Sequence, residues 1–215
     1  MTAVSAAAVV RRRALSHPSS FRRPTPQIDF DRRLEGDMGN DCLITVDGTD
    51  FQIPQKGLPK KGNAFASHKF AGKSALRYEL GVSILGGDLV WIQGPYPAGK
   101  YTDIKIFNKV LRHYLEPGER VEADDGYRGH ASKIKCPKND ANPAANLAMQ
   151  GRARARHETL NGRLKNWGIL KQVFRHHISL HGDVFRACAV LTQLAIDNGE
   201  PLFGVDYGDK FIKIN

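Results

Sequence analysis

Three acidic residues occupy places where a carboxylate is uncommon unless it has a partner. Asp47 ends an apolar run that begins at Leu43, and Asp124 ends a second run that begins at Arg120. Glu158 lies in a basic stretch whose composition is compatible with a helix. An ionised carboxylate is costly to bury unless it is paired or bound to a metal, so packing alone does not account for the two aspartates.

Two strand-end aspartates and one helix glutamate can converge on a pair of hard divalent cations. Mg²⁺ and Mn²⁺ prefer oxygen ligands in near-octahedral geometry and leave positions free for water and phosphate. Two such cations about 4 Å apart are the apparatus of in-line phosphoryl transfer. The sequence therefore predicts phosphodiester cleavage with Asp47, Asp124 and Glu158 as metal ligands and with Mg²⁺ or Mn²⁺ as cofactor.

The stretch around Glu158 places several basic and amide side chains near one helix face. Arg154, Glu158, Asn161 and Lys165 follow one another at spacings of 4, 3 and 4, which a helix brings to one side. We expect Glu158 to face the metals and its neighbours to bind nucleic acid, namely Arg154, Arg156, Asn161, Arg163 and Lys165. The alternative is an intrahelical pair of Glu158 with Arg154 or Arg163, worth only about 0.3 kcal/mol.

Three short motifs in this order resemble those of a known family. They are Asp47-Gly48-Thr49, Asp124-Asp125-Gly126-Tyr127 and Arg154-x-x-x-Glu158-x-x-Asn161-x-x-x-Lys165. Together they resemble the DDE superfamily endonuclease domain of Harbinger-like transposases and are similar to bacterial insertion-sequence transposases. The loop from Gly94 to Asp103 resembles the segment before the helix of that family, and the likeness spans roughly residues 40–200. The resemblance implies a metal-binding Asp47-Asp124-Glu158 triad, a ribonuclease H-like fold and DNA as substrate.

The hydrophobic pattern predicts an α/β chain with a ribonuclease H-like mixed sheet flanked by helices. Strands are expected at 43–53, 73–85, 88–93 and 120–124, with a further one at 133–136, and helices at 101–115, 142–167 and 180–198. Gly86-Gly87 predicts a hairpin, and residues 94–99 are expected to end the third strand. In such a fold the first and fourth strands are neighbours, which would bring Asp47 and Asp124 together.

Three other aspartates lie close to these motifs. Asp47 and Asp50 point to opposite faces of a strand because their separation is odd, and Asp124 and Asp125 do the same. We interpret Asp50 and Asp125 as solvated. Either Thr102 or Asp103 is a suitable N-cap for the helix that follows.

Length and charge favour one domain with a polyanionic partner. The chain has 215 residues and a net charge of +10. We divide it into a basic, disordered tail (1–37), the endonuclease domain (38–205) and a C-terminal tail (206–215). No apolar run approaches the roughly 18 residues of a membrane helix. The DNA substrate favours the nucleus, although the Arg-rich, acid-free residues 1–28 also match an organellar transit peptide.

Cysteines and histidines give no zinc pattern. The three cysteines are far apart and form no CxxC pair, which is typical of a reducing compartment. Cys42 and Cys188 are expected in the core, as are Trp91 and Trp167. Surface or phosphate-facing roles are expected for His113, His130, His157, His176, His177 and His181.

Two competing functions use the same fold. One is a DNA-binding or regulatory protein without catalysis, suggested by the basic stretch around Glu158 and by the short segment before Asp47, where transposases of this kind carry a DNA-binding region. The other is an RNA-cleaving nuclease. For the DNA endonuclease, a separate DNA-binding protein that supplies targeting is an expected partner. A homo-oligomer is compatible with the endonuclease and with both competing functions.

Overall fold

The computed structural model describes residues 28–35, 41–54, 63–137, 143–200 and 202. Its strands are β1 (Cys42–Gln52), β2 (Ala75–Ser83), β3 (Leu89–Pro97), β4 (Arg120–Ala123) and β5 (Ile134–Lys135). Its α-helices are α2 (Asp103–Lys109), α3 (Pro143–Asn166), α4 (Gly168–Lys171) and α5 (His181–Asp197). Short 3-10 helices are η1 (Phe30–Leu34), η2 (His68–Phe70), η3 (Leu111–His113), η4 (Asp125–Tyr127) and η6 (Ile178–Leu180).

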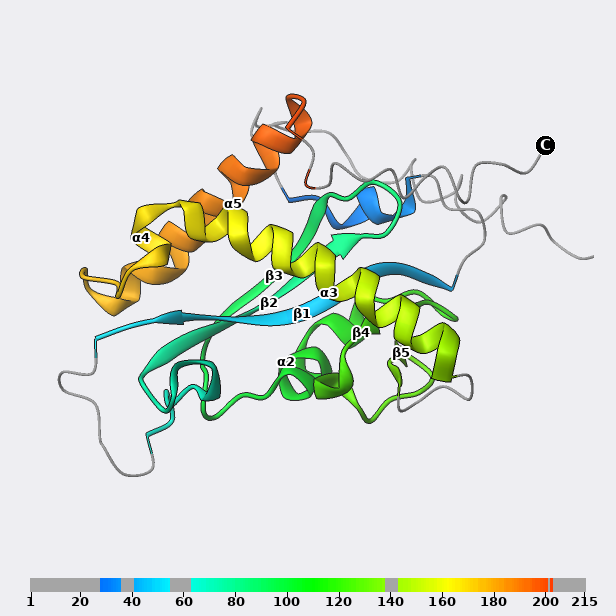
Figure 1. The fold of residues 1–215 in the computed structure, drawn as a ribbon, viewed down its shortest axis with the longest axis horizontal. Helices are drawn as coiled ribbons and strands as arrows, with labels where there is room; N and C mark the ends of the chain where they lie inside the picture. The colour runs from blue at the N-terminus through cyan, green and yellow to red at the C-terminus, as the bar shows by residue number, and fades with distance from the viewer. Residues whose placement is uncertain (1–27, 36–40, 55–62, 138–142, 201, 203–215) are drawn as a thin grey trace, which may run out of the picture.

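The strands form one mixed sheet in the order β3-β2-β1-β4-β5 (Figure 1). β1, β2 and β3 are an antiparallel meander, whereas β4 pairs parallel with β1, and β5 pairs parallel with β4. Val46 of β1 lies opposite Ala123 of β4. The expected α/β class and the expected neighbourhood of the first and fourth strands are therefore confirmed.

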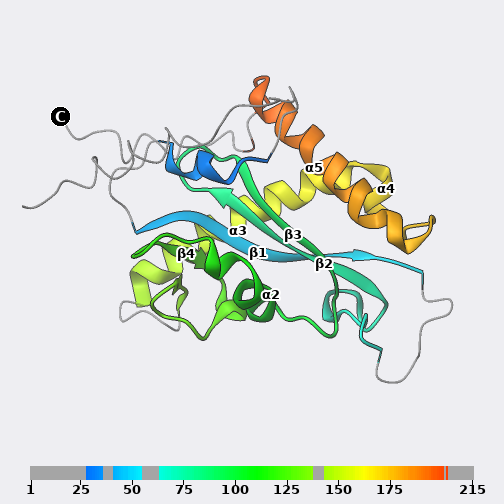
Figure 2. The same ribbon diagram turned by 180° about the vertical axis from the view of Figure 1, so that it is seen from behind.

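Helices cover both faces of the sheet. α3, α4 and α5 lie on one face, and α2 lies on the other, as the views from the front and from behind show (Figures 1 and 2). Each face has its own apolar core. Residues of β1, β2, α3 and α5 fill the first, and residues of β1, β4, α2 and η3 fill the second. The sheet is thus the middle layer of three.

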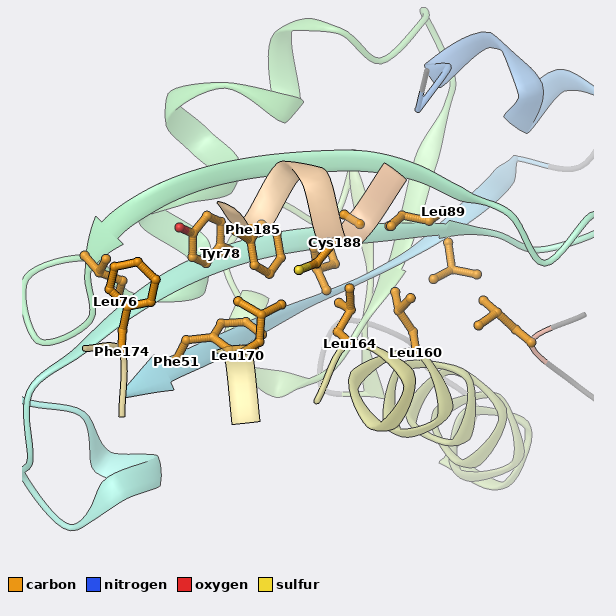
Figure 3. Close-up of a cluster of buried hydrophobic side chains, with 14 of the residues drawn as sticks. Phe51, Leu76, Tyr78, Leu89, Leu160, Leu164, Leu170, Phe174, Phe185 and Cys188 are labelled. Atoms are coloured by element: carbon orange, nitrogen blue, oxygen red, sulfur yellow. The ribbon is translucent and has the colours of Figure 1, made fainter. Parts of the chain in front are cut away.

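The core under α3 and α5 is rich in aromatic rings (Figure 3). Leu160 and Leu164 of α3 point toward the sheet and are fully buried. The ring of Tyr78 stacks on that of Phe185 with 3.8 Å between centroids. The Tyr78 hydroxyl lies 2.7 Å from Nδ1 of His181, a buried residue whose pKa burial lowers to about 4. The expectation that His181 lies at the surface is therefore wrong.

Several element boundaries differ from the sequence prediction. β3 continues to Pro97 instead of ending at Gln93, and a register shift between Arg77 and Glu79 of β2 accommodates the additional residues. The helix expected over 101–115 is divided into α2 and η3. Trp167 is 38% exposed and donates from Nε1 to Thr192, so it is a helix-surface residue and not a core residue.

The chain ends are described in part. Residues 28–35 form η1 and its flanks, and Arg33 of η1 makes a buried ion pair with Glu119 at 2.8 Å. The rest of the predicted tail at 1–37, and all of 206–215, lie outside the described residues. Cys42, Cys136 and Cys188 are buried, as expected for the first and last of them. Among the helices that the structure describes, none combines the length and apolar character needed to cross a bilayer.

Candidate active site

Asp124 follows the carboxyl end of β4, and Asp47 lies within β1 at the point where its pairing with β4 ends. Each is the residue after a cross-strand pair, Val46 opposite Ala123. The side chains of Val46 and Ala123 belong to the core on the α2 face. Because side chains alternate along extended backbone, Asp47 and Asp124 project toward the opposite face, which α3 covers. The sequence prediction that these two carboxylates share one location agrees with this register.

The chain continues in opposite directions from two neighbouring strands at this point, and we refer to the region between Asp47 and the end of β4 as the crevice. From β1 the chain continues to β2 on one side of the sheet, whereas β5 follows β4 on the other side. β4 ends at Ala123, but β1 runs on to Gln52. In open α/β sheets such a divergence at the carboxyl ends of parallel strands is the usual place for a ligand.

Burial and neighbouring charges together determine the pKa of Asp47. Its pKa is raised above the ordinary value, chiefly because the carboxyl group is largely removed from solvent. The ammonium of Lys69 opposes this shift, and the negative charge of Asp124 adds to it. A carboxyl group whose pKa is raised by burial and by a neighbouring negative charge gains from a nearby cation.

Asp124 is positioned by the helix that follows it. It is the N-cap of η4, and its Oδ1 accepts a hydrogen bond of 2.8 Å from the backbone N–H of Gly126. The residue is exposed, so the other carboxylate oxygen remains open to a ligand. Asp125 is half-buried in η4, and the expectation that it is fully solvated is correspondingly too simple.

A further carboxylate, Asp103, lies near this pair. Thr102 is the N-cap of α2 and makes no side-chain cap bond, while Asp103 is the first helical residue. The carboxylate of Asp103 fills the space beside Gly48, where an added Cβ would lie 1.9 Å from Oδ1. Burial raises the pKa of Asp103, Arg77 and Lys69 lower it, and Asp47 and Asp124 raise it further. Of the two expected caps, Thr102 is therefore the N-cap, and Asp103 lies instead beside Gly48.

Asp50 is buried at the centre of a network of charged side chains. The expectation that it is solvated is therefore wrong. It is 2% exposed and accepts two hydrogen bonds from Arg77, at 2.7 and 3.0 Å. It also accepts one from the Ser67 hydroxyl. Arg77 in turn contacts Asp103 at 3.3 Å. Oppositely charged residues within otherwise apolar strands were the one sequence signal that could have revealed this support.

Glu158 lies on the exposed side of α3. The residues of this turn that face the sheet are Arg156 and His157, which are 4% and 3% exposed. Burial lowers the pKa of His157 to about 4. Its ring lies against the Thr45 backbone, although neither nitrogen has a hydrogen-bond partner of standard geometry among the described residues. None of the described contacts joins Glu158 to Asp47 or Asp124.

The predicted nucleic-acid residues of α3 do not all share one environment. Arg154 and Lys165 are exposed beside Glu158, as the spacing predicts. Asn161 is half-buried, and Arg156 faces the protein. Arg163 donates to the backbone carbonyl of Glu200 at 2.7 Å. Among the predicted nucleic-acid residues of α3, Arg154 and Lys165 are therefore the exposed cations.

The three nominated carboxylates do not form a closed cage. Within the described residues, no three His, Cys, Asp or Glu side chains are arranged so that they could hold a metal ion. Comparisons with models of protein families, with curated proteins and with solved structures gave no match. The chemical case for this location therefore depends on Asp47, Asp124 and the charges around them.

Proposed function

We propose that this chain is a divalent-metal-dependent DNA endonuclease of the transposase-related Asp-Asp-Glu type. One observation carries the proposal. Asp47 and Asp124 follow a directly paired position on adjacent parallel strands and project toward the same face of the sheet. Two ionised carboxylates at one crevice repel each other unless a cation lies between them. A metal-dependent nuclease supplies such a cation.

The topology supports the finer assignment of a ribonuclease H-like fold. An antiparallel meander of three strands is followed by β4, which lies parallel to β1 at its free edge. This arrangement is what the resemblance to Harbinger-like transposases requires of residues 40–200. DNA as substrate, a separate targeting protein and a nuclear rather than organellar location follow from the same proposal.

The residues at the crevice fit a hard cation with few protein ligands. Mg²⁺ is commonly bound by one or two carboxylates while water and substrate phosphate complete its octahedron. Asp47 and Asp124 would supply those two carboxylates, and Glu158 stays the predicted third ligand. A bound Mg²⁺ or Mn²⁺ would polarise the scissile phosphate and favour the ionised form of a nearby water. Asp103 and Lys69 would adjust the charge around the pair.

Metal binding is the direct test. We expect calorimetric titration with Mn²⁺ to show binding by the parent that is lost in Asp47→Asn and in Asp124→Asn. Asp183→Asn is the matched control, because Asp183 is exposed on α5, far along the chain from the crevice. Unchanged Mn²⁺ affinity in both site variants, with all proteins folded, would refute the proposal. Nicking assays on DNA and RNA duplexes then separate a DNA endonuclease from a ribonuclease.

A non-catalytic DNA-binding protein of the same fold is the second candidate. The observation that favours it is the exposed position of Glu158, away from the two aspartates. Such a protein binds DNA in a salt-dependent manner, retains that binding in Asp124→Asn and cleaves nothing. Mn²⁺-dependent nicking by the parent that disappears in Asp124→Asn would eliminate this candidate.

A further inference from the structure

Lys69 brings a positive charge into the crevice from a separate loop. It belongs to η2, within the segment 63–74 that precedes β2. Its ammonium donates a hydrogen bond to the backbone carbonyl of Gly48, the residue after Asp47. That carbonyl lies on β1 beyond the end of β4, so the side chain reaches into the gap that β4 leaves.

The loop that carries Lys69 is anchored on both sides. Asn63 Nδ2 donates to Ser74 Oγ at 2.8 Å, and Ala66 forms a β-bridge with Ser74. The Ser67 hydroxyl donates to buried Asp50, which is itself fixed by Arg77. A side chain on an anchored loop loses less conformational freedom when it binds a ligand than one on a mobile loop. Asp50 therefore holds this loop in place through Ser67 and also supports Asp103 through Arg77.

The ammonium of Lys69 is not committed to a carboxylate. Among the described ion pairs, none includes Lys69, although its charge lowers the pKa of Asp47 and of Asp103. An ammonium has three N–H donors, and the described hydrogen bond to Gly48 uses one. The other cation near Asp103, Arg77, is 7% exposed and is bound to Asp50. Lys69 is exposed, so it is the cation of the crevice that a ligand can reach.

We propose that Lys69 contacts the substrate, and that its ammonium binds a non-bridging oxygen of the phosphodiester placed at Asp47 and Asp124. This inference rests on the proposed nuclease function and adds a residue that the sequence motifs do not contain. A phosphodiester carries a negative charge and must approach two carboxylates, so a positive group besides the metal is needed to offset their repulsion. An ammonium gains Coulombic attraction from an anionic phosphate oxygen that a neutral carbonyl does not supply, which favours transfer of the ammonium from Gly48.

Binding to a fluorescein-labelled DNA duplex, measured by anisotropy in Mn²⁺, tests the proposal. We expect Lys69→Met to weaken binding about tenfold and to reduce the slope of log affinity against log salt by about one. Lys69→Arg keeps the charge and should retain most of the affinity. Lys73→Met is the matched control, because Lys73 is an exposed lysine of the same loop. Circular dichroism melts verify that each variant is folded.

Reductive methylation of lysines, read by mass spectrometry, locates the contact independently. DNA should protect Lys69 more strongly than Lys73. Equal affinities of Lys69→Met and Lys73→Met, with no protection of Lys69, would overturn the inference while leaving a Mn²⁺-binding nuclease intact. Tighter Mn²⁺ binding by Lys69→Met with unchanged DNA affinity would also overturn it, since Lys69 would then be only a counter-ion. A parent protein that binds neither Mn²⁺ nor DNA would instead defeat the proposed function itself.

Discussion

The buried carboxyl group of Glu79 should make the stability of this protein fall as pH rises. Glu79 of β2 lies opposite Gly48 and has no exposed surface. Its Oε1 accepts a hydrogen bond of 3.0 Å from Trp91 Nε1, whereas Oε2 has no partner of standard geometry among the described residues. Burial raises the pKa of Glu79 to about 8, and the nearby charge of Asp103 contributes to the shift.

The sign and size of the effect follow from linkage. In the unfolded chain Glu79 loses its proton near pH 4.5, but in the folded chain it keeps that proton until about pH 8. The folded state therefore holds the additional proton between these values, and stability decreases as pH rises across this interval. At about 1.4 kcal/mol per pKa unit, the loss amounts to about 5 kcal/mol. The free energy of unfolding of a small domain is only about 5–15 kcal/mol, so the effect should be readily measured.

Glu79→Gln removes the titrating group while it keeps an oxygen for Trp91. Urea denaturation followed by circular dichroism, from about pH 5 to about pH 9, should show the parent losing stability relative to this variant as pH increases. Glu35→Gln, at an exposed position beside η1, should follow the parent curve. Parallel curves for the parent and Glu79→Gln across this range would refute the reasoning.

Two further substitutions probe the charged support of the crevice. Asp50→Asn should cost about 3–5 kcal/mol in urea denaturation, because the buried guanidinium of Arg77 loses its closest charged partner and keeps the longer contact with Asp103. Asp41→Asn, which breaks an exposed pair with Arg120, should cost at most about 1 kcal/mol. Gly48→Ala should cost about 1–3 kcal/mol through overpacking, because its Cβ would meet Asp103. Adding Asp103→Ala to Gly48→Ala should restore part of that loss, and strict additivity of the two changes in thermal melts would contradict the proposed clash.

The sheet was largely predictable because its signals are local. Apolar runs with turn residues between them located β1, β2 and β4 to within a few residues. The adjacency of β1 and β4, and with it the proximity of Asp47 and Asp124, came from the order of elements. The limits of β3 and of α2 were less accurate, since they depend on a register shift in the sheet and on the packing of the loop at 98–102.

The charged groups around the crevice were harder to predict because their partners are distant in sequence. Asp50 looked like a solvent-facing neighbour of Asp47, but it finds Arg77 across the β1–β2 pair. Lys69 lies in a loop without any motif. The position of Glu158 was inferred from which residues share a helix face, but the orientation of that face is set by Leu160 and Leu164, which turn His157 toward the sheet. Periodicity identifies a face, and only packing decides where it points.

Gly48 and Gly126, the glycines of the two aspartate motifs, both leave space for the carboxylate of Asp103. Asp47 projects toward α3, and the next residue, Gly48, leaves room on the opposite face for the carboxylate of Asp103. Gly126 does the same from the second motif, because a Cβ there would lie 3.2 Å from Asp103 Oδ2 and 2.8 Å from Asp124 Oδ1. Asp103 thus lies between the two motifs, on the face away from α3, where Arg77 links it to Asp50. Each motif therefore combines a carboxylate for the crevice with a gap for the carboxylate behind it. The negative charge behind the pair makes a cation in front of it more necessary, whether that cation is a metal ion or Lys69.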